Sequence, residues 1–77
     1  MEPVIVLVDD DDGSRDAMAR ALQRVGYRVE PFASAEEALD RIRSSDPVDV
    51  VVSDVRMPGM DGYELLRHVR AERPGLP

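Results

Sequence analysis

Hydrophobic residues in this chain fall into two patterns, continuous runs and residues at helical spacing. Two continuous runs rich in β-branched residues, Val4–Val8 and Val48–Ser53, predict strands covered on both faces, as parallel strands usually are. A weaker run at Tyr27–Phe32 predicts a third strand. This run contains Pro31, which cannot donate to a strand ladder, so we expect the strand at an edge of the sheet.

Apolar residues at helical spacing predict three helices, one after each strand. The expected ranges are about 14–25, 34–43 and 62–72. The expected caps are Asp11 or Asp12 for the first helix, Ser34 with Glu37 as a capping box for the second, and Asp61 for the third, with Gly26 ending the first helix. The side chains expected to face the core are Met18, Ala21, Leu22 and Val25, then Ala35, Ala38, Leu39 and Ile42, then Leu65, Leu66 and Val69.

The elements alternate regularly between strand and helix, which predicts an α/β fold. Short connections and right-handed crossovers make the sheet parallel, with helices on both of its faces. The flavodoxin-like arrangement gives the strand order 2-1-3, so the first and third strands are neighbours. We expect a single domain over residues 1–77, with no second domain within them.

Acidic residues follow two of the predicted strands at the point where each strand ends. Asp9 and Asp10 follow the first strand, and Asp54 follows the third. Because the carboxyl ends of neighbouring parallel strands lie side by side, we expect these carboxylates to meet in one crevice. Carboxylates repel one another, so a hard cation such as Mg²⁺, which prefers oxygen ligands, is the simplest reason for the grouping. Asp11 and Asp12 are instead expected to serve the start of the first helix.

The composition narrows the range of functions. The formal net charge is −6, which disfavours binding of nucleic acid or of an anionic membrane by this segment. No apolar run approaches the roughly 20 residues that a membrane helix needs. The chain contains no Cys, which excludes disulfides and thiolate metal sites and is compatible with a reducing cytoplasm. All 10 basic residues are Arg, and there is no Thr.

The sequence resembles the receiver domain of two-component response regulators in three places: Val8-Asp9-Asp10, Asp54, and the loop Met57-Pro58-Gly59-Met60-Asp61-Gly62. The similarity extends over the whole chain in register. It implies that Asp54 is the phosphoacceptor, that Asp10 is a direct Mg²⁺ ligand and that Asp9 holds a metal-bound water. It also implies that the backbone carbonyl of Arg56 is the third protein ligand and that Mn²⁺ can substitute for Mg²⁺.

The same resemblance implies partners and a cellular role. The phosphoryl donor would be a sensor histidine kinase or a phosphotransfer protein, and the chain would act in the cytoplasm as a signalling module rather than as a turnover enzyme. A carboxylate can attack phosphorus to form an acyl phosphate, provided that a metal offsets the repulsion between the anions. In related domains the first helix helps to dock the kinase, which indicates Arg15, Met18 and Ala19 as a partner surface.

Receiver domains normally continue with two more strand–helix units, which supply a Thr or Ser and a Lys to the phosphoryl group. This sequence has no Thr and no Lys, so we expect a truncated, amino-terminal portion of a receiver with those two units missing. The third strand would then expose an apolar edge formed by Val50, Val51 and Val52. Because an unpaired apolar edge favours pairing with another chain, we expect self-association.

Two other interpretations stay open on the sequence. Residues 7–14 are similar to the first motif of haloacid dehalogenase-type phosphatases, with Asp10 as the nucleophile and Asp12 as the acid. That family leaves Asp54 unexplained and needs a Lys, which this sequence lacks. The second alternative is a non-signalling fragment that self-associates. His68 lies between charged neighbours and is expected to be solvated rather than catalytic.

Overall fold

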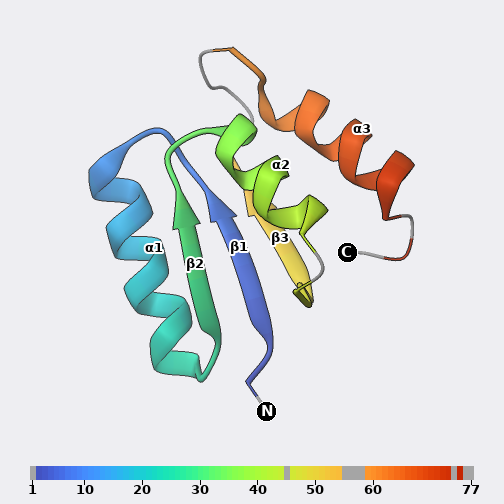
Figure 1. Ribbon diagram of the computed structural model, residues 1–77. Coiled ribbons are helices and arrows are strands. Elements are labelled where there is room, and N and C mark those ends of the chain that lie inside the picture. Colours follow the sequence, from blue (N-terminus) through green and yellow to red (C-terminus); the bar gives the residue numbers. More distant parts are fainter. Residues whose placement is uncertain (1, 45, 55–58, 74, 76–77) are drawn as a thin grey trace.

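Three parallel strands form the sheet, in the order β2-β1-β3 (Figure 1). They are β1 (Val4–Val8), β2 (Arg28–Phe32) and β3 (Val50–Ser53). The predicted α/β class, the strand order and the edge position of β2 are confirmed. The arrangement comes from a computed structural model, which describes residues 2–44, 46–54, 59–73 and 75.

Three helices cover the two faces of this sheet. α1 (Asp12–Val25) packs on one face, mainly against β2, whereas α2 (Ala35–Arg43) and α3 (Gly62–Glu72) lie together on the other (Figure 1). The caps are Asp11, Ser34 and Asp61, and each side chain accepts a hydrogen bond from the backbone N–H three residues further on. The side chains predicted to cap the three helices therefore do so.

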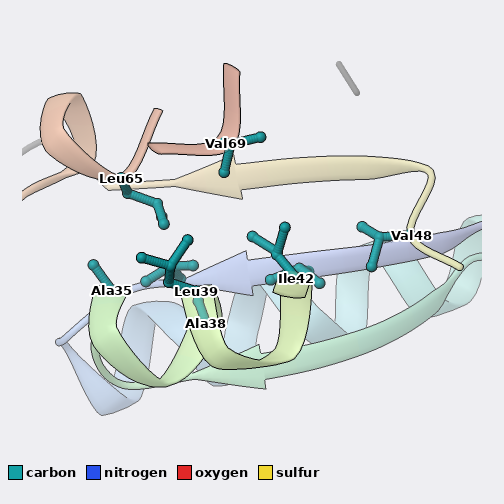
Figure 2. Close-up of a cluster of buried hydrophobic side chains, with 9 residues drawn as sticks. Ala35, Ala38, Leu39, Ile42, Val48, Leu65 and Val69 are labelled. Atoms are coloured by element: carbon teal, nitrogen blue, oxygen red, sulfur yellow. The ribbon is translucent and has the colours of Figure 1, made fainter. Parts of the chain in front are cut away.

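The main hydrophobic cluster lies between the sheet and the α2–α3 pair (Figure 2). Val6 and Val8 contribute from β1, whereas Ile5 and Leu7 are buried outside this cluster because successive strand side chains point to opposite faces. The helices and the segment before β3 add Ala35, Ala38, Leu39, Ile42, Val48, Leu65 and Val69. Each fully buried aliphatic side chain stabilises the fold by about 1.5–3 kcal/mol relative to its exposed state. All the residues predicted to be buried in α2 are buried.

β3 begins at Val50, two residues later than predicted. The chain already lies beside β1 before that point, because the N–H of Asp49 donates to the carbonyl of Val4 at 2.9 Å and Val48 is buried. However, the N–H of Val4 donates to the carboxylate of Asp49 at 2.6 Å. A side chain thus takes the place of the backbone acceptor that would lengthen the ladder.

β2 begins at Arg28 rather than at the predicted Tyr27. Gly26 ends α1 in the left-handed conformation, with a φ of 110°. The N–H of Tyr27 donates to the carbonyl of Leu22 at 3.2 Å, which is part of this helix termination. Tyr27 therefore belongs to the end of α1 and is not available to the sheet.

The buried face of α1 differs from the predicted one. Met18 and Val25 are 47% and 72% exposed, and Ala21 is exposed as well. The helix meets the sheet through Ala19, which is buried, and through the half-buried Leu22. Helical spacing reveals an apolar stripe, but the part of the stripe that is covered depends on the neighbouring elements. In the described part of the chain α1 packs mainly on the edge strand β2, so much of its apolar surface stays uncovered.

α3 has the predicted bounds but a narrower buried face. Leu65 and Val69 are each 1% exposed, whereas Leu66 is 40% exposed, contrary to the prediction. Leu66 lies one residue from Leu65, which turns its side chain by about 100° around the helix. It lines a groove of about 220 Å³ between α3 and β3, together with Val51 and Tyr63.

Candidate functional site

The carboxyl ends of β1 and β3 lie side by side and carry the candidate site. Val8 and Ser53 are partners in the register of the two strands. One residue further along, the N–H of Asp54 donates to the carbonyl of Val8 at 2.9 Å. On the other side of β1, the N–H of Asp9 donates to the carbonyl of Phe32, the last residue of β2, at 3.1 Å. The backbones of Asp9 and Asp54 are therefore both fixed to the end of the sheet.

The structure brings Asp9, Asp10 and Asp54 together, as the strand pattern predicts. One carboxylate oxygen from each lies within 4.8 Å of those of the other two, with Asp9 half-buried and Asp10 and Asp54 exposed. Oxygen ligands 2.0–2.1 Å from Mg²⁺ would lie about 3 Å apart when adjacent and about 4 Å apart when opposite. The three carboxylates could thus hold this ion after a small adjustment, or with one contact through water. Their geometry fits a hard cation that keeps part of its hydration shell.

The turn between β1 and α1 orients the first of these acids. Asp9 Oδ1 accepts a hydrogen bond from the N–H of Asp11 at 2.9 Å. Asp11 Oδ2 in turn accepts from the N–H of Ser14 at 2.8 Å and caps α1, so the helix begins at Asp12 rather than at Ser14. The hydrogen bonds from Ser14 lower the pKa of the Asp11 carboxyl group. Asp11 and Asp12 therefore serve the helix start, in agreement with the sequence interpretation.

Gly59, shortly before α3, lies close to the start of α2. Gly59 has a φ of 72°, and a Cβ atom added to it would lie 2.8 Å from Glu36 Oε2. Met60 packs against the hydrophobic cluster, and Asp61 then caps α3 by accepting from the N–H of Glu64 at 2.9 Å. Arg56, whose carbonyl is the predicted third metal ligand, lies outside the described residues, as do Met57 and Pro58.

Arg15 has a place at the site that the sequence interpretation missed. Its guanidinium donates to the backbone carbonyl of Asp9 at 2.9 Å and forms an ion pair with Asp12. The expected partner surface is therefore only partly available: Arg15 is engaged in these contacts and Ala19 is buried under the sheet, while Met18 is exposed. The sequence does contain a signal for the ion pair with Asp12. Arg15 follows Asp12 by three residues, a spacing that brings two side chains together on the same face of a helix.

His68 is exposed on α3, as expected. No helix among the described residues is long and apolar enough to cross a membrane.

Comparisons with known proteins identify relatives over nearly the whole chain. A family model described as the response regulator receiver domain matches residues 5–77. The C4-dicarboxylate transport transcriptional regulatory protein DctD of Rhizobium meliloti (strain 1021) is 48% identical over 75 residues, which are 97% of this chain and 16% of that protein. The chain spans between 15% and 30% of the length of the first curated relatives that it matches.

Solved structures share the fold. The receiver domain from the hybrid histidine kinase CckA has a TM-score of 0.86 at 39% identity, over 96% of this chain and 69% of that one. The response regulator TrrA from Thermotoga maritima, in complex with Mg(2+)-BeF, has a TM-score of 0.88 at 32% identity, over 94% of this chain and 62% of that one. The similarity thus includes a structure with a divalent cation bound.

Proposed function

This chain belongs to the response regulator receiver domain family, and on that basis we propose that it accepts a phosphoryl group on Asp54. The observation that carries the proposal is the grouping of Asp54 with Asp9 and Asp10, whose carboxylate oxygens lie within 4.8 Å of one another. The donor is a sensor histidine kinase or a phosphotransfer protein. The hybrid histidine kinase CckA, whose receiver domain has the same fold, supports this choice of partner.

The chemistry of the step follows from the residue types. A carboxylate oxygen of Asp54 forms a bond to phosphorus while the bond between phosphorus and the imidazole nitrogen of the donor breaks, which yields an acyl phosphate. A bound Mg²⁺, or Mn²⁺ in its place, neutralises charge on the transferring oxygens. Asp10 would hold the ion directly and Asp9 through a water, with the carbonyl of Arg56 as a further ligand. Asp54 is exposed, so a donor can reach it without rearrangement of the core.

We propose a signalling role in the cytoplasm rather than turnover of a substrate. Each Asp54 takes up one phosphoryl group, and its release by hydrolysis returns the chain to its starting state. The sequence contains neither Lys nor Thr, the residue types that the family resemblance assigns to a phosphoryl contact.

The phosphatase alternative finds no support in this geometry. It requires Asp12 to act as an acid beside Asp10, but Asp12 lies in the first turn of α1, is 90% exposed and pairs with Arg15. It also leaves the position of Asp54 unexplained. Phosphorylation of Asp10 instead of Asp54 would reverse this judgement.

The proposal is tested by mass spectrometry of the intact chain after incubation with acetyl phosphate and Mg²⁺. We expect one phosphoryl group on the parent chain and on Asp16→Asn, a control that removes an exposed acid of α1. We expect none on Asp54→Asn and none when EDTA removes the metal. An adduct that persists in Asp54→Asn, or a parent chain that takes up no phosphoryl group, would contradict the assignment.

We also propose self-association through the outer edge of β3. In the described part of the chain no strand pairs with that edge, and the neighbouring groove has an apolar lining. The lining residues are Val51, Ser53, Gly62, Tyr63, Leu65, Leu66 and Val69. A second copy can add its own β3 to the edge because backbone pairing needs no specific side chains.

A further inference from the structure

Asp9 is held from three directions at the end of β1. Its N–H donates to the carbonyl of Phe32 at 3.1 Å, and its side chain accepts from the N–H of Asp11 at 2.9 Å. Its carbonyl accepts from Arg15 Nη1 at 2.9 Å. The donors of the first two contacts are backbone N–H groups, whereas the third donor is the side chain of a residue in α1. The contact from Arg15 is therefore the one that a substitution can remove while Asp9 itself is kept.

The carbonyl of Asp9 belongs to the peptide group that joins Asp9 to Asp10. A peptide group is planar, so fixing the direction of its carbonyl also fixes the direction in which the chain enters Asp10. From this geometry we infer that Arg15 is a positioning residue, which sets the orientation of the Asp9–Asp10 peptide and hence the separation of the two carboxylates. The inference rests on the proposed function, since it concerns the same acidic site.

Arg15 is itself fixed, as a positioning residue must be. The side chain of Arg15 is 20% exposed, and its Nη2 lies 2.5 Å from Asp12 Oδ1. The backbone N–H of Arg15 donates to the carbonyl of Asp11 at 2.9 Å. One planar guanidinium thus spans two acceptors, the carbonyl of Asp9 and the carboxylate of Asp12. The ammonium of a Lys is a single point and lacks this fork, so Arg15→Lys keeps the charge without the two-point contact.

Positioning and simple electrostatics predict opposite effects of removing Arg15. A positive charge near three carboxylates repels an incoming cation, so its loss should strengthen metal binding if charge alone matters. If Arg15 holds the Asp9–Asp10 peptide, its loss should weaken metal binding, because the two carboxylates are no longer pre-oriented. The sign of the change therefore distinguishes the two explanations.

The test measures the affinity of the chain for Mn²⁺ by electron paramagnetic resonance, which detects the free ion. Arg15→Gln should weaken binding about tenfold, the lower end of the range for partners that orient metal ligands. Arg15→Lys should fall between Arg15→Gln and the parent chain. The matched control is Arg20→Gln on the same helix, which removes the same charge from an exposed pair with Asp16. It should change the affinity by no more than about twofold.

A second measurement on the metal-free chain keeps the inference separate from the proposed function. Circular dichroism first establishes that each variant is folded. In nuclear magnetic resonance spectra, Arg15→Gln should then shift the amide signals of Asp10 and Asp11, whereas Arg20→Gln should leave them unchanged. Equal or tighter Mn²⁺ binding by Arg15→Gln, or unchanged Asp10 signals, would overturn the inference. A parent chain that binds no Mn²⁺ would instead contradict the proposed metal site, and the Asp10 signals would still decide the role of Arg15.

Discussion

Arg41 of α2 forms a two-point ion pair with Glu30 of β2. Nε lies 2.6 Å from one carboxylate oxygen of Glu30, and Nη2 lies 3.0 Å from the other. The same guanidinium donates to Ser44 Oγ and to the carbonyls of Asp46 and Pro47, each at 3.2 Å. A single side chain therefore ties the edge strand to α2 and to the segment that leads into β3. The hydrogen bond from Arg41 lowers the pKa of Glu30 below its ordinary value.

The first prediction concerns the pH dependence of this pair. Glu30→Gln should lower the free energy of unfolding by about 1 kcal/mol at pH 7, since both side chains are largely shielded from water. The folded-state pKa of Glu30 is below the ordinary value of 4.5, so its contribution is present above pH 4.5 and is lost as the pH falls through the folded-state pKa. Urea titrations at several pH values should show the difference between parent and variant shrinking on acidification.

The control for this measurement is Glu72→Gln, which removes the pair of Glu72 with Arg43, at 2.7 Å, on the exposed surface of α3. It should cost less stability than Glu30→Gln because water screens the exposed pair. A loss from Glu30→Gln that persists undiminished at low pH would show that packing rather than charge is responsible.

The second prediction compares two adjacent leucines of α3. Leu65 is 1% exposed and Leu66 is 40% exposed. Leu65→Ala should lower the free energy of unfolding by about 2–5 kcal/mol, because it leaves a cavity in the cluster. That is a large share of the total stability of a chain this size, about 4–12 kcal/mol. Leu66→Ala should cost clearly less. Equal losses in chemical denaturation would mean that Leu66 is covered in solution.

Local sequence patterns predicted the buried face of a helix well where the helix packs against more than one kind of element. α2 packs against both the sheet and α3, and its four predicted core positions are all buried. α1 has the sheet on one side, and Met18 and Val25 of its predicted stripe are exposed. Helical periodicity alone cannot distinguish the buried stripe of α2 from the exposed stripe of α1. The pattern shows which side chains are apolar, but it does not show whether another element covers them.

The candidate site was also predicted only in part from the sequence. The positions of Asp9, Asp10 and Asp54 followed from strand ends and strand order, since parallel pairing places those ends together. The contact of Arg15 with the Asp9 carbonyl could not be predicted, because it depends on the path of the turn and on one side-chain conformation. Sequence patterns thus located the carboxylates but not the group that orients them.

The third prediction compares Gly13, inside α1, with Gly26, which ends that helix. Gly26 has a φ of 110° and no atom near the position of an added Cβ, so Gly26→Ala should cost about 1–2 kcal/mol through backbone strain alone. Gly13 lies inside the helix, where an added Cβ would meet Asp11 Oδ2 at an ordinary 3.6 Å. Gly13→Ala should therefore stabilise the chain, by up to about 1 kcal/mol. Thermal unfolding of both variants checks the signs, and a stabilising Gly26→Ala would contradict the helix termination.

The fourth prediction concerns the metal. Asp10→Asn should weaken Mg²⁺ binding at least tenfold, roughly the smallest effect expected even for an outer partner of a metal ligand. Asp16→Asn removes the same charge from the exposed face of α1 and should leave the affinity nearly unchanged. Isothermal titration calorimetry gives both affinities. Similar losses in the two variants would show that overall negative charge attracts the ion and that the three carboxylates form no specific site.

The fifth prediction concerns self-association. The average mass of the parent chain in sedimentation equilibrium should rise with concentration. Leu66→Glu places a charge in the groove beside β3 and should reduce this rise. Val25→Glu changes another exposed apolar residue, on α1, and should have little effect. A parent chain that stays monomeric at high concentration, or equal effects of the two variants, would count against pairing through β3.

The pairing of β1 with β3 makes the acidic cluster a property of the folded chain alone. Asp9 and Asp54 are far apart in the sequence. Their carboxylates come together only when β1 and β3 pair and the N–H of Asp54 donates to the carbonyl of Val8. An ion that binds all three carboxylates would bind the unfolded chain weakly, so mass action would add its binding energy to the stability of the fold. At one hundred times its dissociation constant the gain is about 2.7 kcal/mol. An increase in the concentration of free divalent cation would thereby raise the fraction of chains that are folded.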